Sequence, residues 1–171
     1  PEEPKPEPEN KYYSVFSSDT TTVAPGVTQT INYALTTDSK QIVYYIAVAD
    51  ISRSDVNVYA NYHANDPSQG WAMSRVTDQM AAAQSRHSDP DDAATYIEHY
   101  NVVVGVNADF YNMTTGVPSS ALVMEGKEYH SAGSSNFFAI LKDGTAVIGK
   151  PGDYAEYKDQ ITEAVGGSIY L

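Results

Sequence analysis

The stretch ALVMEGKEYHSAGSSNFFAILKDGTAVIG, residues 121 to 149, contains four short apolar or alternating runs separated by glycine-containing turns. The runs predict strands at residues 121–124, 128–130, 137–141 and 145–148. Glu125-Gly126 and Asp143-Gly144 lie between neighbouring runs, where a tight turn needs a residue that adopts positive φ without cost, as glycine does. The stretch therefore predicts two β-hairpins and an antiparallel sheet in this part of the chain.

Upstream of the hairpins the sequence predicts further strands. An Ala-Pro-Gly turn at residues 24–26 follows a Thr- and Ser-rich segment, and residues 27–35 alternate between apolar and polar. QIVYYIAVA at 41–49 is almost entirely apolar, which is typical of a central strand covered on both faces. Residues 55–62 alternate and predict a half-buried strand, and the valines of 102–106 predict a buried one.

A helical layer is predicted between the two groups of strands. Apolar side chains recur at spacings of three and four at Met73, Val76, Met80 and Ala83. Ser88-Asp89-Pro90 ends this pattern, and a second short helix is predicted at residues 91–99. Strands, then helix, then hairpins, without regular βαβ alternation, indicate an α+β fold: a mixed, mainly antiparallel sheet with one or two helices packed on it.

Composition and charge restrict the class of function. The 171 residues suffice for one domain with a core, and the formal net charge of −12 arises from 22 acidic against 10 basic residues. Such a surface repels phosphate backbones and anionic membranes, which argues against nucleic-acid binding and against adsorption to an anionic membrane. The sequence shows no transmembrane or signal-peptide pattern. Because it contains no cysteine, disulfides, thiol catalysis and thiolate metal sites are excluded.

The first ten residues, PEEPKPEPEN, differ in composition from the rest of the chain. Proline at every second or third position, among charged residues, favours an extended and solvated chain. We interpret residues 1–11 as a tether that enters a domain at residues 12–171, and a disordered terminus is the alternative. Such spacers are common in proteins fixed to a cell envelope, so we expect an extracellular or envelope location.

Sequence motifs for metal, nucleotide or nucleophilic chemistry are not found. The four histidines, which belong to no His-x-x-x-His arrangement, are His63, His87, His99 and His130. The acidic run after His87 lacks the spacing of a calcium loop. There is no Gly-x-Gly-x-x-Gly, no Gly-Lys-Ser/Thr loop and no Gly-x-Ser-x-Gly elbow. We therefore predict no metal and no cofactor.

A cluster of amides, a carboxylate and two rings follows the predicted valine strand in GVNADFYNMTTGVP. Asn107 and Asn112 can donate and accept hydrogen bonds, as sugar hydroxyls require, and Phe110 and Tyr111 offer flat faces for sugar rings. Asp109 follows a strand end, a position that often faces a pocket. In the alternative interpretation the stretch is an Asx-type turn, in which the carboxylate and an amide cap backbone N–H groups and the rings fill the core.

Four blocks of the sequence, taken together, resemble the phosphodiester glycosidase domain family. The blocks are WAMSRVTDQ (71–79), VVVGVNADFYNMTTGVP (102–118), LVMEGKEY (122–129) and FFAILKDGTAVIG (137–149). The family signature is a strand ending in Asn-Gly-Gly/Asp-Phe-Phe, a Thr-Gly-x-Pro turn, then a strand and a hairpin with Asp-Gly. Its members include a mammalian lysosomal enzyme that removes N-acetylglucosamine from a sugar-phosphate diester, and many bacterial envelope proteins.

The resemblance implies hydrolysis of a glycosyl-1-phosphodiester in a glycan or cell-envelope polymer, with a carbohydrate or glycosyl phosphate as the ligand. Under it, Asp109 is an acid/base or orienting carboxylate and Asn107 binds sugar or phosphate oxygens. The residues expected to bind substrate are Phe110, Tyr111, Asn112, Gly116 and Pro118.

The chain also departs from the family pattern. Ala108 stands where the family often has glycine, and its Cβ narrows the approach of a ligand. Ser119-Ser120 stand where Leu-Gly or Gly-Gly is common, and the sequence reaches Leu171 before the Arg-Thr and Asp-Gly-Gly-Gly-Ser segments that also line the family site. We therefore expect an incomplete domain, completed by its remaining half or by another chain. The alternative function is a non-catalytic carbohydrate-binding or structural surface module.

Overall fold

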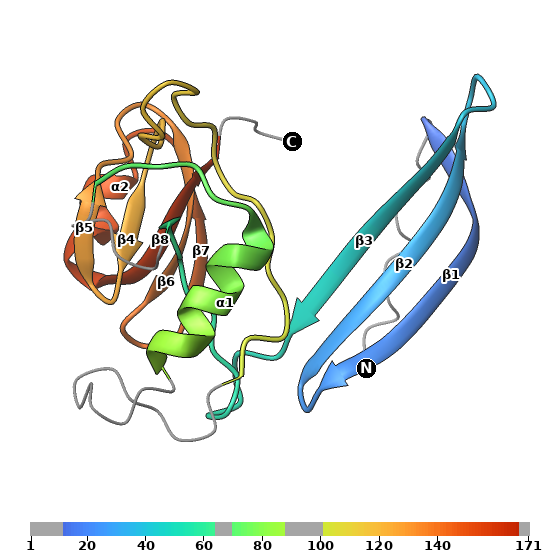
Figure 1. Ribbon diagram of the computed structural model, residues 1–171, viewed down its shortest axis with the longest axis horizontal. Coiled ribbons are helices and arrows are strands. Elements are labelled where there is room, and N and C mark those ends of the chain that lie inside the picture. The colour runs from blue at the N-terminus through green and yellow to red at the C-terminus, as the bar shows by residue number, and fades with distance from the viewer. Residues whose placement is uncertain (1–11, 64–69, 88–100, 168–171) are drawn as a thin grey trace. The chain divides into compact units, whose positions relative to one another are not determined.

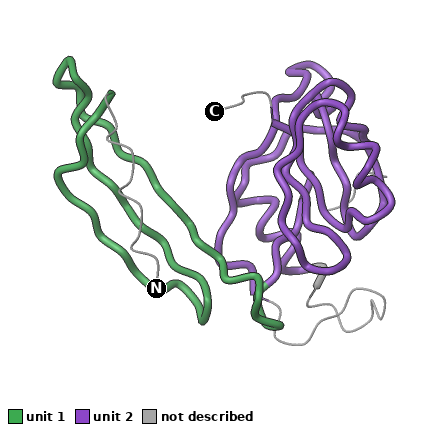
Figure 2. Tube along the Cα trace, turned by 180° about the vertical axis from the view of Figure 1, so that it is seen from behind, with its two compact units in different colours: residues 1–56 green, residues 57–171 purple. Residues whose placement is uncertain are grey.

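The computed structural model describes residues 12–63, 70–87 and 101–167 (Figure 1). The predicted tether and the predicted second helix at 91–99 lie outside the described residues. The chain divides into two compact units, which we call unit 1 (Pro1–Val56) and unit 2 (Asn57–Leu171) (Figure 2).

Unit 1 is a three-stranded antiparallel meander in the order β1-β2-β3. Its strands are β1 (Tyr13–Ala24), β2 (Val27–Thr36) and β3 (Gln41–Ala49). The predicted turn at residues 24–26 joins β1 to β2, and Gly26 adopts a φ of 76° there. The sequence therefore predicts the β1–β2 hairpin correctly.

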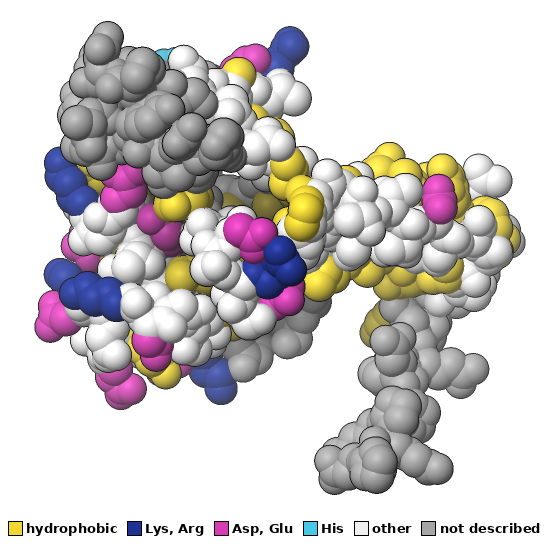
Figure 3. Space-filling view, turned by 90° about the horizontal axis from the view of Figure 1, so that it is seen from below, with side chains coloured by type: hydrophobic (Ala, Val, Ile, Leu, Met, Phe, Trp, Pro, Cys, Tyr) yellow, Lys and Arg dark blue, Asp and Glu magenta, His cyan; other side chains and the backbone are white. Residues whose placement is uncertain are grey.

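The prediction that residues 41–49 form a central, covered strand is wrong. β3 is an edge strand of its sheet, and Tyr45 on it is 62% exposed. Exposed apolar side chains occur on all three strands of unit 1, and several show at its surface (Figure 3). An apolar run reports β-propensity but does not specify how many neighbours a strand has.

In its described residues, unit 2 contains a five-stranded antiparallel sheet in the order β5-β4-β8-β6-β7, with two α-helices (Figure 1). The strands are β4 (Leu122–Met124), β5 (Lys127–His130), β6 (Asn136–Leu141), β7 (Ala146–Gly149) and β8 (Ile161–Gly167). The helices are α1 (Val76–His87), α2 (Tyr154–Tyr157) and the 3₁₀ turn η3 (Lys158–Gln160). Both predicted hairpins, β4–β5 and β6–β7, are confirmed, as are the predicted helix and the α+β class.

No helix in the described ranges is long and apolar enough to cross a membrane.

The sequence patterns do not predict β8, the strand that joins the two hairpins into one sheet. β8 pairs with β4 on one side and with β6 on the other. Its sequence ITEAVGG includes a carboxylate and two glycines, residue types that are depleted in strands. Its place in the sheet is therefore set by packing and pairing.

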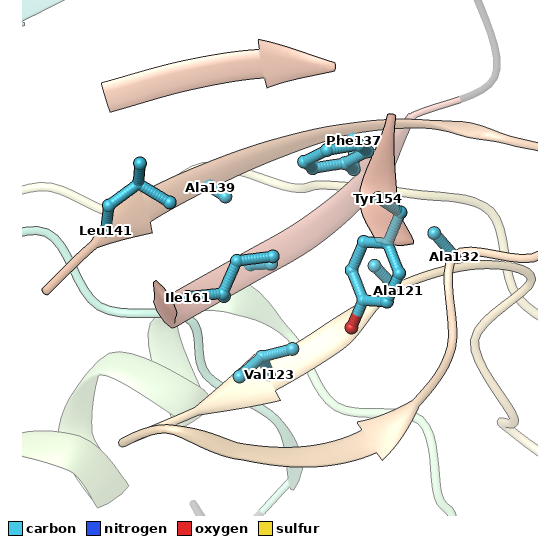
Figure 4. Packing of buried hydrophobic residues seen from close by; sticks show 9 residues of the cluster. Ala121, Val123, Ala132, Phe137, Ala139, Leu141, Tyr154 and Ile161 are labelled. Carbon is cyan, nitrogen blue, oxygen red and sulfur yellow. The ribbon is translucent and has the colours of Figure 1, made fainter. Parts of the chain in front are cut away.

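The apolar core lies on one face of this sheet (Figure 4). Its members are Ala121, Val123, Ala132, Phe137, Ala139, Leu141, Tyr154, Ile161 and Ala164. The rings of Phe137 and Tyr154 meet edge-on with centroids 5.2 Å apart, and the Tyr154 hydroxyl points away from Phe137 (Figure 4). This hydroxyl donates to Glu128 Oε2 at 2.6 Å. α2 thus anchors the core face through a ring and a polar tip.

Two predicted strands are not formed. Residues 55–62 and 102–106 have no ladder partner among the described residues, and Val106 is 84% exposed. Residues near 60 instead contact the sheet and α1 through single hydrogen bonds. Ala60 N–H donates to Glu163 Oε2 at 3.0 Å, and Asn61 Nδ2 donates to the carbonyl of Gln79 at 2.8 Å. Alternation and β-branching mark strand-like residues, but a strand also needs a partner.

Candidate functional site

The predicted site stretch forms a tight loop that leads into β4, which we call the 109–120 loop. Tyr111 and Pro118 form an isolated antiparallel bridge, so the chain reverses its direction between them. Three backbone hydrogen bonds close the loop, from Asn112 N to Val117 O (2.8 Å), Gly116 N to Asn112 O (2.7 Å) and Ser119 N to Phe110 O (2.8 Å). The loop is therefore a hydrogen-bonded element of the fold.

The carboxylate of Asp109 is bound by this loop. Asp109 adopts a φ of 57°, which Asp tolerates better than most residues. Its Oδ1 accepts the N–H of Phe110 and its Oδ2 accepts the N–H of Ser120, both at 2.7 Å. Through these bonds Asp109 caps two backbone N–H groups, as the turn interpretation predicted.

Asn112 caps the turn that follows. Its Oδ1 accepts the N–H groups of Thr114 (2.8 Å) and Thr115 (3.1 Å). Asn107 precedes the loop, is exposed, and makes no hydrogen bond with any described residue. Of the two predicted amides, Asn107 is therefore the one whose side chain makes no hydrogen bond with the described residues.

The two rings are exposed, so the turn interpretation is wrong in placing them in the core. Phe110 is 64% exposed and Tyr111 is 45% exposed. Exposed apolar rings on an ordered loop are more typical of a contact surface than of a purely structural turn. The structure thus combines capping carboxylate and amide groups with a pair of outward rings.

Gly116 connects the loop to the segment before α1. It adopts a φ of 77°, and a Cβ there would lie 2.8–2.9 Å from three backbone atoms of Ala72. The Tyr62 hydroxyl accepts the N–H of Ala72 and lies 2.6 Å from the Ala72 carbonyl oxygen and 3.2 Å from that of Gly116. Both conformation and space therefore require glycine at this position.

Gly116→Ala is expected to destabilise the protein more than Gly126→Ala. Their φ angles, 77° and 76°, are almost equal, so each substitution costs about 1–2 kcal/mol of left-handed strain. Only at Gly116 does the new Cβ also meet backbone, whereas nothing lies within 4 Å at Gly126. Urea unfolding of the two variants measures the difference. Equal losses would contradict the close packing of Gly116 on Ala72.

His130 joins the loop through Ser120. Its Nδ1 lies 2.7 Å from the carbonyl oxygen of Ser120 and 3.1 Å from that of Ser131. Because carbonyl oxygens only accept, Nδ1 carries a proton and, in the neutral ring, Nε2 carries the lone pair. Ser120 N–H donates to Asp109, so one residue connects the carboxylate to the imidazole.

Sequence reasoning misses His130 because no short motif relates it to Asp109. The connection depends on the β4–β5 hairpin, in which Leu122 and His130 are paired. The usable signal was the predicted hairpin itself, whose register returns the chain to the start of β4.

One aromatic ring packs against His130, and a second ring packs against the first. Trp71 meets the His130 ring edge-on at 6.4 Å between centroids, and Tyr62 meets Trp71 at 4.9 Å. Burial raises the pKa of Tyr62 above its ordinary value, so its hydroxyl stays protonated at neutral pH. The site therefore offers rings, amide groups and one imidazole, which suits a polar ligand with an apolar face.

Within residues 12–63, 70–87 and 101–167, no three His, Asp or Glu side chains gather in a way that could hold a metal ion. The chain matches no protein-family model, and no curated protein is similar to it. The relation to phosphodiester glycosidases thus remains a proposal that rests on the sequence blocks.

Proposed function

We propose that the 109–120 loop, with Asn107 beside it, recognises the sugar of a glycosyl phosphate in an extracellular glycan or cell-envelope polymer. The observation that carries the proposal is the pair of exposed rings, Phe110 and Tyr111, on a loop held by backbone hydrogen bonds. A rigid loop loses little entropy when it binds, and aromatic faces are suited to stacking.

The bonds of Asp109 and Asn112 support this proposal. They use the polar side chains to hold the backbone, which leaves the neighbouring rings outward. Ligand contacts would then come from Phe110, Tyr111 and the amide of Asn107. A surface of two rings and an amide is small, and it fits one or two sugar units better than a large partner.

Hydrolysis of the glycosyl-1-phosphodiester is the second candidate function, and the four sequence blocks favour it. Such an enzyme needs a donor that clamps the phosphate and usually a second carboxylate. The hydrogen bonds of the loop within the described residues include no Lys, Arg or second carboxylate. Binding therefore has more support from the geometry than catalysis does.

A test of catalysis by Asp109→Asn must include a stability measurement. Asparagine has one acceptor oxygen, whereas Asp109 accepts N–H groups with both of its oxygens. The substitution therefore places an NH₂ group against a backbone donor. A loss of turnover indicates catalysis only where the melting temperature is retained.

Phe110→Ala and Tyr111→Ala are each expected to weaken sugar binding about tenfold, because a stacked ring contributes about 1 kcal/mol beyond its buried area. Isothermal titration calorimetry with glucose 1-(methyl phosphate) and with methyl glucoside measures the change. Phe16→Ala is the matched control, since Phe16 is a similarly exposed ring in unit 1. Unchanged affinity in both loop variants, or an equal loss in the control, would contradict the proposal.

A further inference from the structure

The imidazole of His130 is held in one orientation. Its Nδ1–H is shared between the carbonyl oxygens of Ser120 (2.7 Å) and Ser131 (3.1 Å), and Trp71 packs edge-on against the ring. Nε2 makes no hydrogen bond with any described residue. A ring that is fixed through one nitrogen, with no partner for the other among the described residues, is prepared to bind a ligand through that second nitrogen.

Titratable groups are connected to His130 through Ser120 and through Trp71. Asp109 is linked to it through Ser120, whose N–H donates to Asp109 and whose carbonyl oxygen accepts from Nδ1. Tyr62, which stays neutral, packs against Trp71, and the Tyr62 and His63 ring centroids lie 6.5 Å apart. Both oxygens of Asp109 accept N–H groups, which reduces its repulsion of an incoming anion.

We propose that His130 is the phosphate-binding residue of this site. As an imidazolium it donates Nδ1–H to Ser120 and Nε2–H to a non-bridging oxygen of a glycosyl phosphodiester. The proposal rests on the proposed sugar recognition, and it supplies the cationic donor that the loop itself lacks. A charged donor to an anion is shorter and stronger than a neutral hydrogen bond.

The test uses a probe whose own charge is constant. Glucose 1-(methyl phosphate) is a diester and carries one negative charge between pH 5 and 8, and methyl glucoside carries none. Affinity is followed by calorimetry and by the fluorescence of Trp71, which is the only tryptophan and touches His130. We expect the diester to bind about tenfold more tightly at pH 5.5 than at pH 8, because histidines usually titrate in this range, and the glucoside to show no such change.

His130→Gln is expected to hold the diester affinity at its pH 8 value across this range. Glutamine can still donate to Ser120 but carries no charge, and thermal melting checks that the variant folds. His63→Gln is the matched control and should keep the pH dependence. A diester affinity that is independent of pH in the wild type, or that still rises at low pH in His130→Gln, would overturn the assignment.

Two further outcomes separate this inference from the proposed function. If both sugars bind equally at every pH and Phe110→Ala weakens both, sugar recognition stands and the role of His130 is refuted. If neither sugar binds, dimethyl phosphate tests His130 alone through the NMR signals of its ring. A perturbation at pH 5.5 that is lost at pH 8 supports the phosphate site, and the lack of any perturbation refutes it.

Discussion

Gly166→Ala is expected to destabilise unit 2 by about 3 kcal/mol, because overpacking of a closed core often costs about 1–3 kcal/mol and here the new Cβ meets both a side chain and the backbone. A Cβ at Gly166 would lie 1.5 Å from Ser120 Oγ, 2.6 Å from Ser120 Cβ and 3.1 Å from the backbone N of Ala121. The backbone cannot move away easily, since Gly166 N–H donates to the Ala121 carbonyl at 2.9 Å. Chemical unfolding in urea measures the loss.

Gly167→Ala is the matched control for this prediction. Gly167 is the next residue of β8, and no heavy atom lies within 4 Å of a Cβ there. We expect a change of about 1 kcal/mol or less, in either direction. Adding Ser120→Gly to Gly166→Ala should recover part of the stability. Equal losses at the two glycines would show that β4 and β8 do not pack as described.

The close packing of Gly166 against Ser120 connects β8 to the candidate site. Ser120 is fully buried, its Oγ has no hydrogen-bond partner among the described residues, and its backbone binds both Asp109 and His130. Gly166 leaves the space in which this side chain lies. We infer that the glycine at 166 is needed to position the site as well as to close the sheet.

The second large effect is a pH-dependent stability that arises from Glu163. This carboxyl group lies on β8 and is only 6% exposed, and burial raises its pKa to about 7. Its oxygens accept the N–H groups of Glu125 (2.9 Å) and Ala60 (3.0 Å), which opposes the shift, whereas the charge of Glu125 adds to it. Burial is the largest of these effects.

The direction of the pH effect follows from this shift. The ordinary pKa of the group is 4.5, so the folded protein binds this proton more tightly than the unfolded chain does. The stabilisation that comes from this proton is fully present below pH 4.5 and is lost as the pH rises to 7. Over this range the free energy of unfolding falls by about 3 kcal/mol at most. Urea midpoints between pH 5 and 8 should therefore fall with increasing pH.

Glu163→Gln is expected to remove most of this slope. Its NH₂ group faces one of the two backbone N–H donors that Glu163 binds, so the slope with pH is compared and not the absolute stability. Asp143→Asn is the control, because Asp143 is exposed and backbone and side-chain hydrogen bonds from Thr145 lower its pKa, which places its effect below pH 4. A slope that persists in Glu163→Gln, or a wild-type stability that rises from pH 5 to 8, would contradict the burial of this carboxyl group on β8, which has no ion-pair partner among the described residues.

Local signals in the sequence predict the hairpins and α1 well. Glu125-Gly126 and Asp143-Gly144 have turn chemistry that acts over two residues, and both turns form. β8 is different, because its carboxylate at Glu163 and its glycine at Gly166 are explained only by partners far along the chain. The apolar run of β3 fails for the converse reason, since hydrophobicity alone does not place a strand at the centre of a sheet.

The candidate site could be predicted only in part from the sequence, because some of its contacts are short-range and others depend on residues far along the chain. Asp109 and Asn112 form short-range capping bonds that their residue types favour. The outward direction of Phe110 and Tyr111 depends on the packing of the whole loop, and the contact of His130 depends on the register of β4 and β5. Sequence patterns therefore indicate the loop but miss the residue across the hairpin.

Sugar recognition by the 109–120 loop is tested most directly by NMR of the ¹⁵N-labelled protein during titration with glucose 1-(methyl phosphate) at pH 5.5. We predict saturable shifts of the backbone amide signals of Phe110, Tyr111 and Ser120 and of the ring signals of His130, with the strands of unit 1 unchanged. Shifts confined to unit 1, or no saturable shift at millimolar ligand, would contradict the proposed function.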